Sequence, residues 1–186
     1  MKKWDEQFEL EYWRRYDDNF YIDYLDEKHK HFNFDIHNKI IDIGGGRFGG
    51  SLYRYQHGVE RFLLDPLADE FKEFGSLPEN IKVIKGSVLD IPFEKEYFDA
   101  VVVWEVLDHL TTINELREAQ REIRRVLKIG GVLYFNQPIR IYSTSGHTLL
   151  VSEEELLNFN LDLLEKHNKP FYDNGIEIYA KFKRTS

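Results

Sequence analysis

The sequence predicts an α/β protein built on an open, mostly parallel β-sheet. From about Lys39 onward, short runs rich in β-branched and aromatic residues alternate with helical patterns, as expected for parallel strands joined by helices. A glycine-rich turn follows the first of these runs, which is common where a strand of such a sheet leads into its connection. The last segment, from Ile176, alternates apolar and polar residues after a turn signal, and this indicates an antiparallel strand that closes the sheet.

Five segments before the closing hairpin are strand candidates. They are Lys39–Ile43, Arg61–Leu64, Lys82–Lys85, Ala100–Trp104 and Val132–Asn136. The clearest helix is expected from Thr112 to Ile129, because Thr112 and Glu115 have the spacing of a capping box and Gly130 follows. A shorter helix is expected over residues 153–159, after Ser152.

Residues 1–38 differ from the rest because an aromatic residue recurs every four positions, at Trp4, Phe8, Tyr12, Tyr16, Phe20 and Tyr24. Four residues advance about 400° on a helix, so this stripe drifts by roughly 40° at each step. One straight helix cannot bury all of it. We expect two short helices, broken near Asp17–Asn19 and laid over the sheet, whose aromatic residues either pack or line a substrate pocket.

Composition limits the function classes. The 186 residues suffice for one domain with a real core, and no apolar run approaches a membrane span. The net charge of −8 disfavours nucleic acid as a partner, and a small molecule is expected instead. The absence of cysteine excludes disulfides and thiol nucleophiles. The first residues lack the apolar core of a secretion signal, so a cytoplasmic protein is expected.

The turn Gly44-Gly45-Gly46-Arg47-Phe48-Gly49 fits G-x-G-x-x-G, which alone leaves several nucleotide-type ligands open, including a dinucleotide. Asp42, two residues before the first glycine, is suited to pair with the ammonium of an amino-acid ligand and would repel a pyrophosphate. Asp65 ends the next strand, where a carboxylate can bind two ribose hydroxyls. Asp65 can equally cap the helix that would begin at Pro66.

Four blocks in this order resemble class I S-adenosylmethionine-dependent methyltransferases. They are Asp42–Gly46, Leu64–Pro66, Gly86–Phe93 and Tyr97–Val103, and the helix and turn over Glu118–Gly131 add to the likeness. The resemblance implies a three-layer Rossmann-like fold of about seven strands, the last one antiparallel. It also implies a single methyltransferase domain over residues 1–186, with a helical cap (1–38), a cofactor-binding core (39–137) and a lid loop, helix and closing hairpin (138–186).

The resemblance further implies where the cofactor binds. Asp42 and the glycines would hold the methionine end, Asp65 the ribose, and Ser87 with the Val88 backbone the adenine edge. Two positions depart from the family pattern: Ser87 stands where a carboxylate is common, and Phe48 where a third glycine is usual. The expected cofactor-binding residues are Asp42, Gly44, Gly45, Gly46, Asp65, Pro66, Ser87, Val88 and Trp104.

Methyl transfer needs positioning, exclusion of water and, for a hydroxyl acceptor, a base. His109 follows the fourth strand and His147 follows the fifth, so both are candidate bases, although either can be a packing residue. No three ligands have the spacing of a metal site, so no metal is expected. The acceptor is expected to be small, such as a sugar or other metabolite hydroxyl.

Two alternatives stay open. A nicotinamide- or nucleotide-binding oxidoreductase would use the same glycine turn, and a non-catalytic binding partner with a degenerate methyltransferase fold would explain Phe48 and Ser87.

Overall fold

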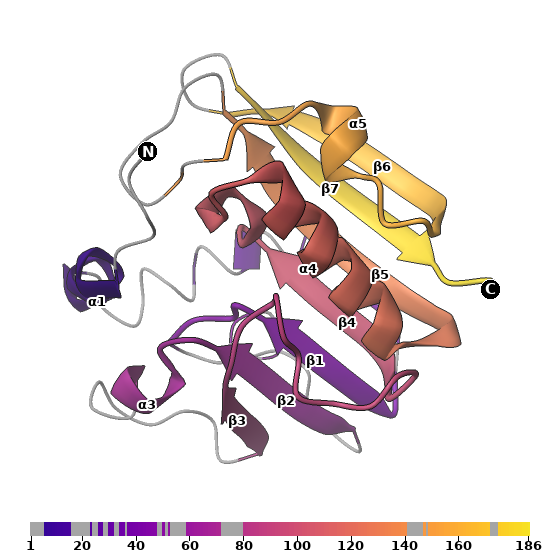
Figure 1. Ribbon diagram of the computed structural model, residues 1–186, viewed down its shortest axis with the longest axis horizontal. Helices are drawn as coiled ribbons and strands as arrows, with labels where there is room; N and C mark the ends of the chain where they lie inside the picture. Colours follow the sequence, from indigo (N-terminus) through magenta and orange to yellow (C-terminus); the bar gives the residue numbers. More distant parts are fainter. Residues whose placement is uncertain are drawn as a thin grey trace.

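Seven strands form one mixed sheet in the described part of the protein. The computed structural model describes residues 6–15, 23, 26–27, 30–31, 34–35, 37–47, 50, 52, 59–71, 80–140, 147, 149–171 and 175–186. The strand order is β3-β2-β1-β4-β5-β7-β6 (Figure 1). The strands are β1 (Lys39–Ile43), β2 (Glu60–Asp65), β3 (Ile81–Lys85), β4 (Phe98–Trp104), β5 (Leu127–Ile139), β6 (Asp162–Pro170) and β7 (Ile176–Lys183).

The direction of the strands confirms the predicted fold class. Strands β3, β2, β1, β4 and β5 run parallel to one another, and all five expected strands are present. Strand β7 pairs antiparallel with both β5 and β6, which makes the closing hairpin. The turn expected before β7 includes residues 173 and 174, which lie outside the described residues.

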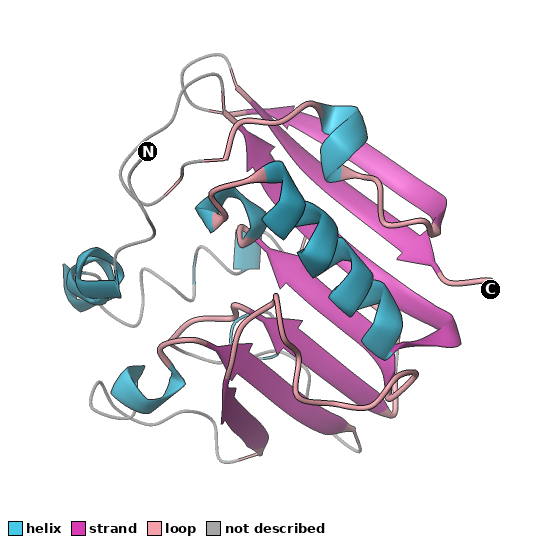
Figure 2. Ribbon diagram, viewed as in Figure 1, coloured by secondary structure: helices cyan, strands magenta, loops and turns pink. Residues whose placement is uncertain are grey.

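The core lies on both faces of the central strands. Val101 and Val103 of β4 are fully buried against α4 (Ile113–Val126), which crosses one face of the sheet (Figure 2). Ala100 and Val102 point to the opposite face and are buried among a second apolar cluster that includes Leu52. Burial on both faces explains why β4 is a continuous apolar run.

Helix α4 begins as predicted and ends earlier than predicted. The Thr112 hydroxyl accepts from Glu115 N, and the Glu115 side chain accepts from Thr112 N, so the capping box is present. The helix ends at Val126 instead of Ile129, because Leu127 is already extended and pairs with Phe98 of β4. This pairing and the backbone donation from Tyr97 N to Val126 O replace the last helical turn.

The remaining helices are short and lie at the margins of the sheet. They are α1 (Glu6–Arg15), α3 (Ala68–Phe71), the 3₁₀ turn η3 (Leu107–His109) and α5 (Glu153–Leu156). Helix α5 begins after Ser152 as expected, with a Ser152–Glu155 capping box, but it is shorter than the predicted 153–159. Helices α1 and α3 lie on the side toward which the parallel strands point (Figure 1). The break expected near residues 17–19 lies outside the described residues.

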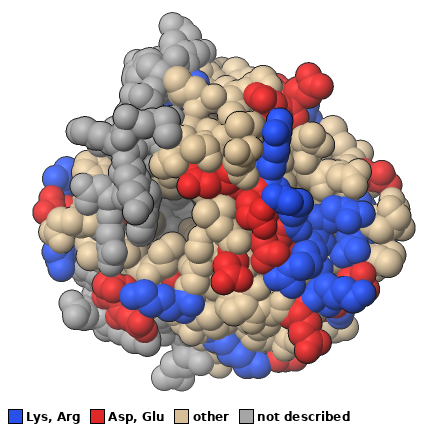
Figure 3. Space-filling view, viewed as in Figure 1, with Lys and Arg blue, Asp and Glu red and all other residues tan. Residues whose placement is uncertain are grey.

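The exposed side of α4 is rich in charge of both signs. Figure 3 shows lysine and arginine side chains gathered over the second half of this helix, with acidic side chains along one flank. Arg121 pairs with Glu118, and Arg125 with Glu122 at 2.6 Å. The first pair is that of a solvated helix face, whereas the second is part-buried, and Arg125 also donates to the carbonyls of Ile91 and Phe93. None of the helices described is both long enough and apolar enough to cross a lipid bilayer.

The contact of α4 with the sheet gives a stability prediction. Ile123 is fully buried in the core on this face, so Ile123→Ala should lower the free energy of unfolding by about 2–5 kcal/mol. The exposed Arg117 on the same helix is the matched control, and Arg117→Ala should change it by no more than about 0.5 kcal/mol. Urea denaturation of the three proteins measures both effects. Equal stability of all three would show that α4 does not pack as described.

Candidate functional site

The turn after β1 wraps closely around a buried carboxylate. Gly44 has a φ of +69°, a left-handed conformation that favours glycine. A Cβ on Gly45 would lie 2.3 Å from Leu63 Cδ1 and 2.8 Å from the carboxyl carbon of Asp42. Asp42 itself is 1% exposed. The glycines are therefore required for the turn to fold over Asp42 and bring its backbone to the edge of the sheet.

Asp65 connects this turn with the end of β2. Its Oδ2 accepts from Gly46 N at 3.1 Å and its Oδ1 from Leu67 N at 2.8 Å. The expected cap belonged to a helix beginning at Pro66, but α3 begins at Ala68, so the bond to Leu67 N closes the turn that leads into α3. The bond to Gly46 N was not foreseen. Burial raises the pKa of Asp65 to about 6, although both backbone donors act to lower it. Each carboxylate oxygen has a second lone pair that can accept a further hydrogen bond.

The other expected cofactor-binding residues lie at the same edge of the sheet. Ser87 follows β3, and its hydroxyl accepts from Leu89 N at 3.2 Å within a local turn. Val88 is buried in the core, and Pro66 is exposed beside Asp65. Trp104 is half-buried at the end of β4 and contacts Phe34, with ring centroids 5.8 Å apart. In the strand order β3-β2-β1-β4 these positions follow or end the strands on both sides of β1, so they share the carboxyl edge of the sheet with the glycine turn.

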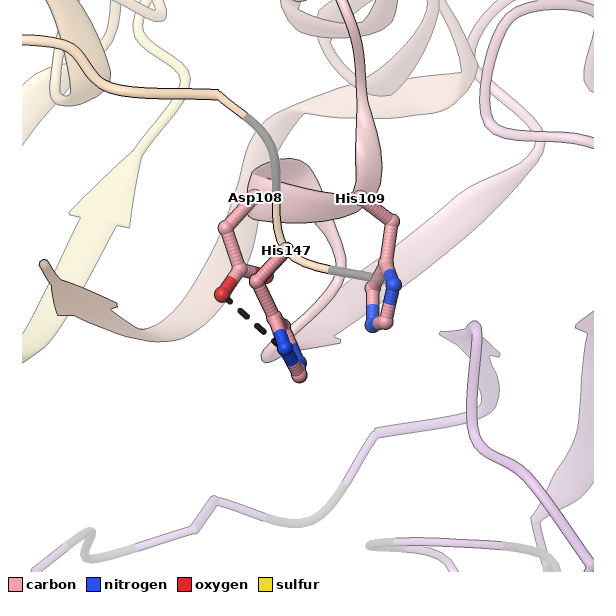
Figure 4. A group of neighbouring side chains, drawn as sticks. All are labelled: Asp108, His109 and His147. Carbon is pink, nitrogen blue, oxygen red and sulfur yellow. Dashed lines mark ion pairs between the residues drawn. The ribbon is translucent and has the colours of Figure 1, made fainter. Parts of the chain in front are cut away.

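Two histidines and an aspartate meet at the ends of β4 and β5 (Figure 4). His147 Nε2 lies 3.9 Å from Asp108 Oδ2, and the centroids of the His109 and His147 rings are 4.6 Å apart. Asp108 is 5% exposed, and its Oδ2 accepts from Arg140 Nε at 3.1 Å. Leu149 N donates to the Asp108 carbonyl at 3.1 Å, which holds the segment around His147 against η3.

The structure also brings α1 to this cluster. Glu9 is 8% exposed, and its Oε1 lies 3.7 Å from His109 Nδ1. Burial raises the pKa of Glu9 above its ordinary value, against the effect of His109. No pattern in the sequence indicates this contact, since Glu9 is one of several acidic residues between the aromatic positions of the first segment.

The pKa values and ion pairs define what this cluster can do. Burial lowers the pKa of His147 below 6.5, so its imidazole is neutral near pH 7 and able to accept a proton. One ligand atom from each of Asp108, His109 and His147 lies within 4.8 Å of the others, although the residues are too far apart in sequence to suggest a metal site. Arg140 supplies a positive charge to Asp108, with Nε 3.1 Å from its Oδ2.

The strand order, the glycine turn after β1 and the acidic residue ending β2 define a Rossmann-like α/β protein with its ligand site at the carboxyl edge of the sheet. The family described as a methyltransferase domain matches residues 41–135, just over half of the chain. The chain belongs to this family. The resemblance found in the sequence is thereby confirmed, and the family does not support the oxidoreductase alternative.

The chain is also similar to individual proteins. It is 28% identical over 139 residues to a sarcosine/dimethylglycine N-methyltransferase of Aphanothece halophytica, an alignment covering 71% of this chain and 48% of the relative. The chain thus spans about half the length of that relative. The N-methyltransferase NodS of Bradyrhizobium japonicum WM9, solved with S-adenosyl-L-homocysteine, has a TM-score of 0.68 at 20% identity, covering 94% of this chain and 92% of NodS.

A putative methyltransferase of Bacillus halodurans C-125 has a TM-score of 0.67 at 15% identity, covering 87% of this chain and 99% of that chain. At these identities the solved structures establish the fold.

Asp65 gives a prediction for the pH dependence of stability. Because its pKa in the folded protein is about 6, above the ordinary 3.8, the free energy of unfolding contains a contribution that is complete below pH 3.8 and is lost as pH rises through 6. By about 1.4 kcal/mol per pKa unit, the loss is on the order of 3 kcal/mol. Asp65→Asn should lack this loss in urea denaturation curves recorded across the range.

Asp99 provides a control of opposite sign. Burial would raise its pKa, but Lys128, 2.7 Å away, and Lys39 N hold the pKa below its ordinary value. Removing this carboxylate with Asp99→Asn should therefore lower stability at neutral pH more than at acid pH. If the free energy of unfolding varies with pH in the same way for wild type and Asp65→Asn, burial does not raise the pKa of Asp65 as described.

Proposed function

We propose that the chain transfers a methyl group from S-adenosylmethionine to a small acceptor, a sugar or other metabolite hydroxyl, and releases S-adenosylhomocysteine. The observation that carries the proposal is the position of two sites on one edge of the sheet. The glycine turn and Asp65 lie at the ends of β1 and β2, and the pair of Asp108 and His147 lies beyond β4 and β5. Ligands of open α/β sheets bind at this edge.

Each part of the cofactor is assigned to residues at the carboxyl edge of the sheet. Bound S-adenosylmethionine would supply a methyl group on a positively charged sulfur. Asp42 and Gly44–Gly46 would hold its methionine end, and Asp65 its ribose. Ser87 and Val88 would lie along the adenine, with Pro66 and Trp104 beside the cofactor. Asp42 and Asp65 are both more than nine-tenths buried, and a cationic ligand suits two such carboxylates better than a pyrophosphate does.

His147 is the proposed base. Neutral near pH 7, it would take the proton of the acceptor hydroxyl as the oxygen bonds to the methyl carbon. Asp108 favours the tautomer with its proton on Nε2, the nitrogen that faces Asp108 Oδ2, and this tautomer has its basic lone pair on Nδ1. His109, whose ring lies beside that of His147 and close to Glu9, is the second candidate.

An amine is the second candidate acceptor. The relative in Aphanothece halophytica is named as an N-methyltransferase, and the buried carboxylate of Glu9 beside His109 is suited to bind an ammonium. The proposal keeps the other expectations from the sequence: one domain with a cap, core and lid, a cytoplasmic location, and neither nucleic acid nor membrane as a partner.

Histidine replacements test the proposed base. With an acceptor found by screening monosaccharides and small alcohols for S-adenosylhomocysteine release, His147→Ala should lower kcat about 10²–10⁴-fold. The dissociation constant for S-adenosylhomocysteine should stay unchanged. In the wild type, kcat/KM should fall as pH drops below the lowered pKa of His147, because the base becomes protonated.

His167→Ala is the matched control, because His167 is an exposed histidine of β6 whose ring contacts Glu165. It should leave kcat unchanged. If His147→Ala retains wild-type kcat, His147 is not the base. If the wild type binds S-adenosylhomocysteine but turns over neither hydroxyl nor amine acceptors, the non-catalytic alternative is favoured.

A further inference from the structure

A small cavity lies beside Asp108, apart from the glycine turn. It has a volume of about 10 Å³, which is room for about one water-sized group. Three polar residues line it: Asp108 of η3, Gln137 of β5 and Arg140 just beyond β5. The rest of the lining is mostly apolar and includes Leu107, Ile139, Leu149, Val151 and Leu156.

Two buried polar atoms of the lining lack a hydrogen-bond partner among the described residues. They are Oδ1 of Asp108 and Nε2 of Gln137, on side chains that are 5% and 1% exposed. The Gln137 amide is fixed in orientation, because its Oε1 accepts from Leu107 N at 2.9 Å. Its Nε2 is therefore a donor, while Asp108 Oδ1 is an acceptor. Buried polar groups without partners are costly, so this pair points to a ligand.

The pair selects the chemistry of that ligand. A hydroxyl group both donates and accepts, so one hydroxyl can donate to Asp108 Oδ1 and accept from Gln137 Nε2. An ammonium has donors only and cannot accept from Gln137. A carboxylate has acceptors only and would be repelled by Asp108. The cavity has room for one hydroxyl oxygen, so the carbon atoms of the ligand would lie outside it.

The cavity adjoins the proposed base through Asp108. The Oδ1 of this carboxylate belongs to the cavity pair, while its Oδ2 contacts Arg140 and lies 3.9 Å from His147 Nε2. Leu149 lines the cavity two residues after His147, and its backbone is bonded to η3. The cavity and His147 therefore lie on either side of the same carboxylate, so the two can act on neighbouring groups of one acceptor.

We propose that this cavity is a hydroxyl-recognition subsite, in which Asp108 Oδ1 and Gln137 Nε2 anchor one hydroxyl of an acceptor that carries two neighbouring hydroxyls. The inference rests on the proposed function and narrows its acceptor to a vicinal diol, such as a sugar ring presents. Gln137 is then a binding residue for the acceptor, a role that its position inside β5 did not suggest from the sequence.

The test compares trans-1,2-cyclohexanediol with cyclohexanol as probes, using the protein saturated with S-adenosylhomocysteine. The diol should bind at least tenfold more tightly than the mono-ol in a titration followed by NMR. Gln137→Glu keeps an oxygen to accept from Leu107 N and loses the donor, so it should weaken diol binding at least tenfold. Asn136→Asp is the control for a carboxylate buried at the neighbouring position of β5, and it should leave diol binding unchanged.

Three results would overturn the subsite: equal affinity for diol and mono-ol, tighter binding of cyclohexylamine than of the diol, or unchanged diol affinity in Gln137→Glu. If the glutamate variant does not fold, Gln137→Met and the wild-type comparison of the two alcohols decide the matter.

A crystal structure of the diol-saturated protein shows whether a diol hydroxyl or a water molecule occupies the cavity. A diol oxygen between Asp108 and Gln137 supports the subsite, and a water there overturns it. Normal binding of S-adenosylhomocysteine with no preference for the diol would reject the subsite alone. Failure to bind S-adenosylhomocysteine would reject the proposed function itself.

Discussion

The parallel register of β2, β1, β4 and β5 is the constraint on which the site depends. Ile43 at the end of β1 is level with Leu64 of β2 and Val103 of β4, and Trp104 is level with Asn136 of β5. The residues that follow these positions therefore lie side by side, although they are up to about a hundred residues apart in the sequence. A shift of the register would separate the glycine turn from Asp65 and would move Asp108 away from β5. Burial of both faces of β4 holds the register, because every slip would expose or misplace apolar side chains.

The edge set up by this register contains several buried carboxylates, each stabilised in a different way. Asp65 accepts from two backbone N–H groups, Asp108 pairs with Arg140, and Glu9 lies against His109. Burying charge is costly, and such groups are stable only with donors or cations around them. The buried carboxylates at the ends of β1 and β2 suit a positively charged cofactor. At the ends of β4 and β5, the pair of Asp108 and Gln137 instead suits a neutral group that both donates and accepts.

Local signals explain what the sequence predicted well. The strands follow from apolar runs bounded by turns, and both capping boxes follow from Thr112 and Ser152 with a glutamate three residues later. The end of α4 was predicted wrongly, because pairing between Leu127 and Phe98 outweighs the local helical pattern. The contacts of Glu9 with His109 and of Gln137 with Leu107 join segments 100 and 30 residues apart, so no local pattern reveals them. The glycine turn was predicted from its residues, while its bond to Asp65 required the packing of β1 against β2.

Isothermal titration with S-adenosylhomocysteine and with NAD tests the central claim, that the edge formed by β1 and β2 binds an adenosyl amino-acid cofactor. The account predicts saturable binding of S-adenosylhomocysteine, none of NAD, and at least tenfold weaker binding in Asp42→Asn, which keeps the shape of the side chain and removes its charge. A protein that binds NAD instead, or that binds S-adenosylhomocysteine equally well without the Asp42 carboxylate, would contradict it.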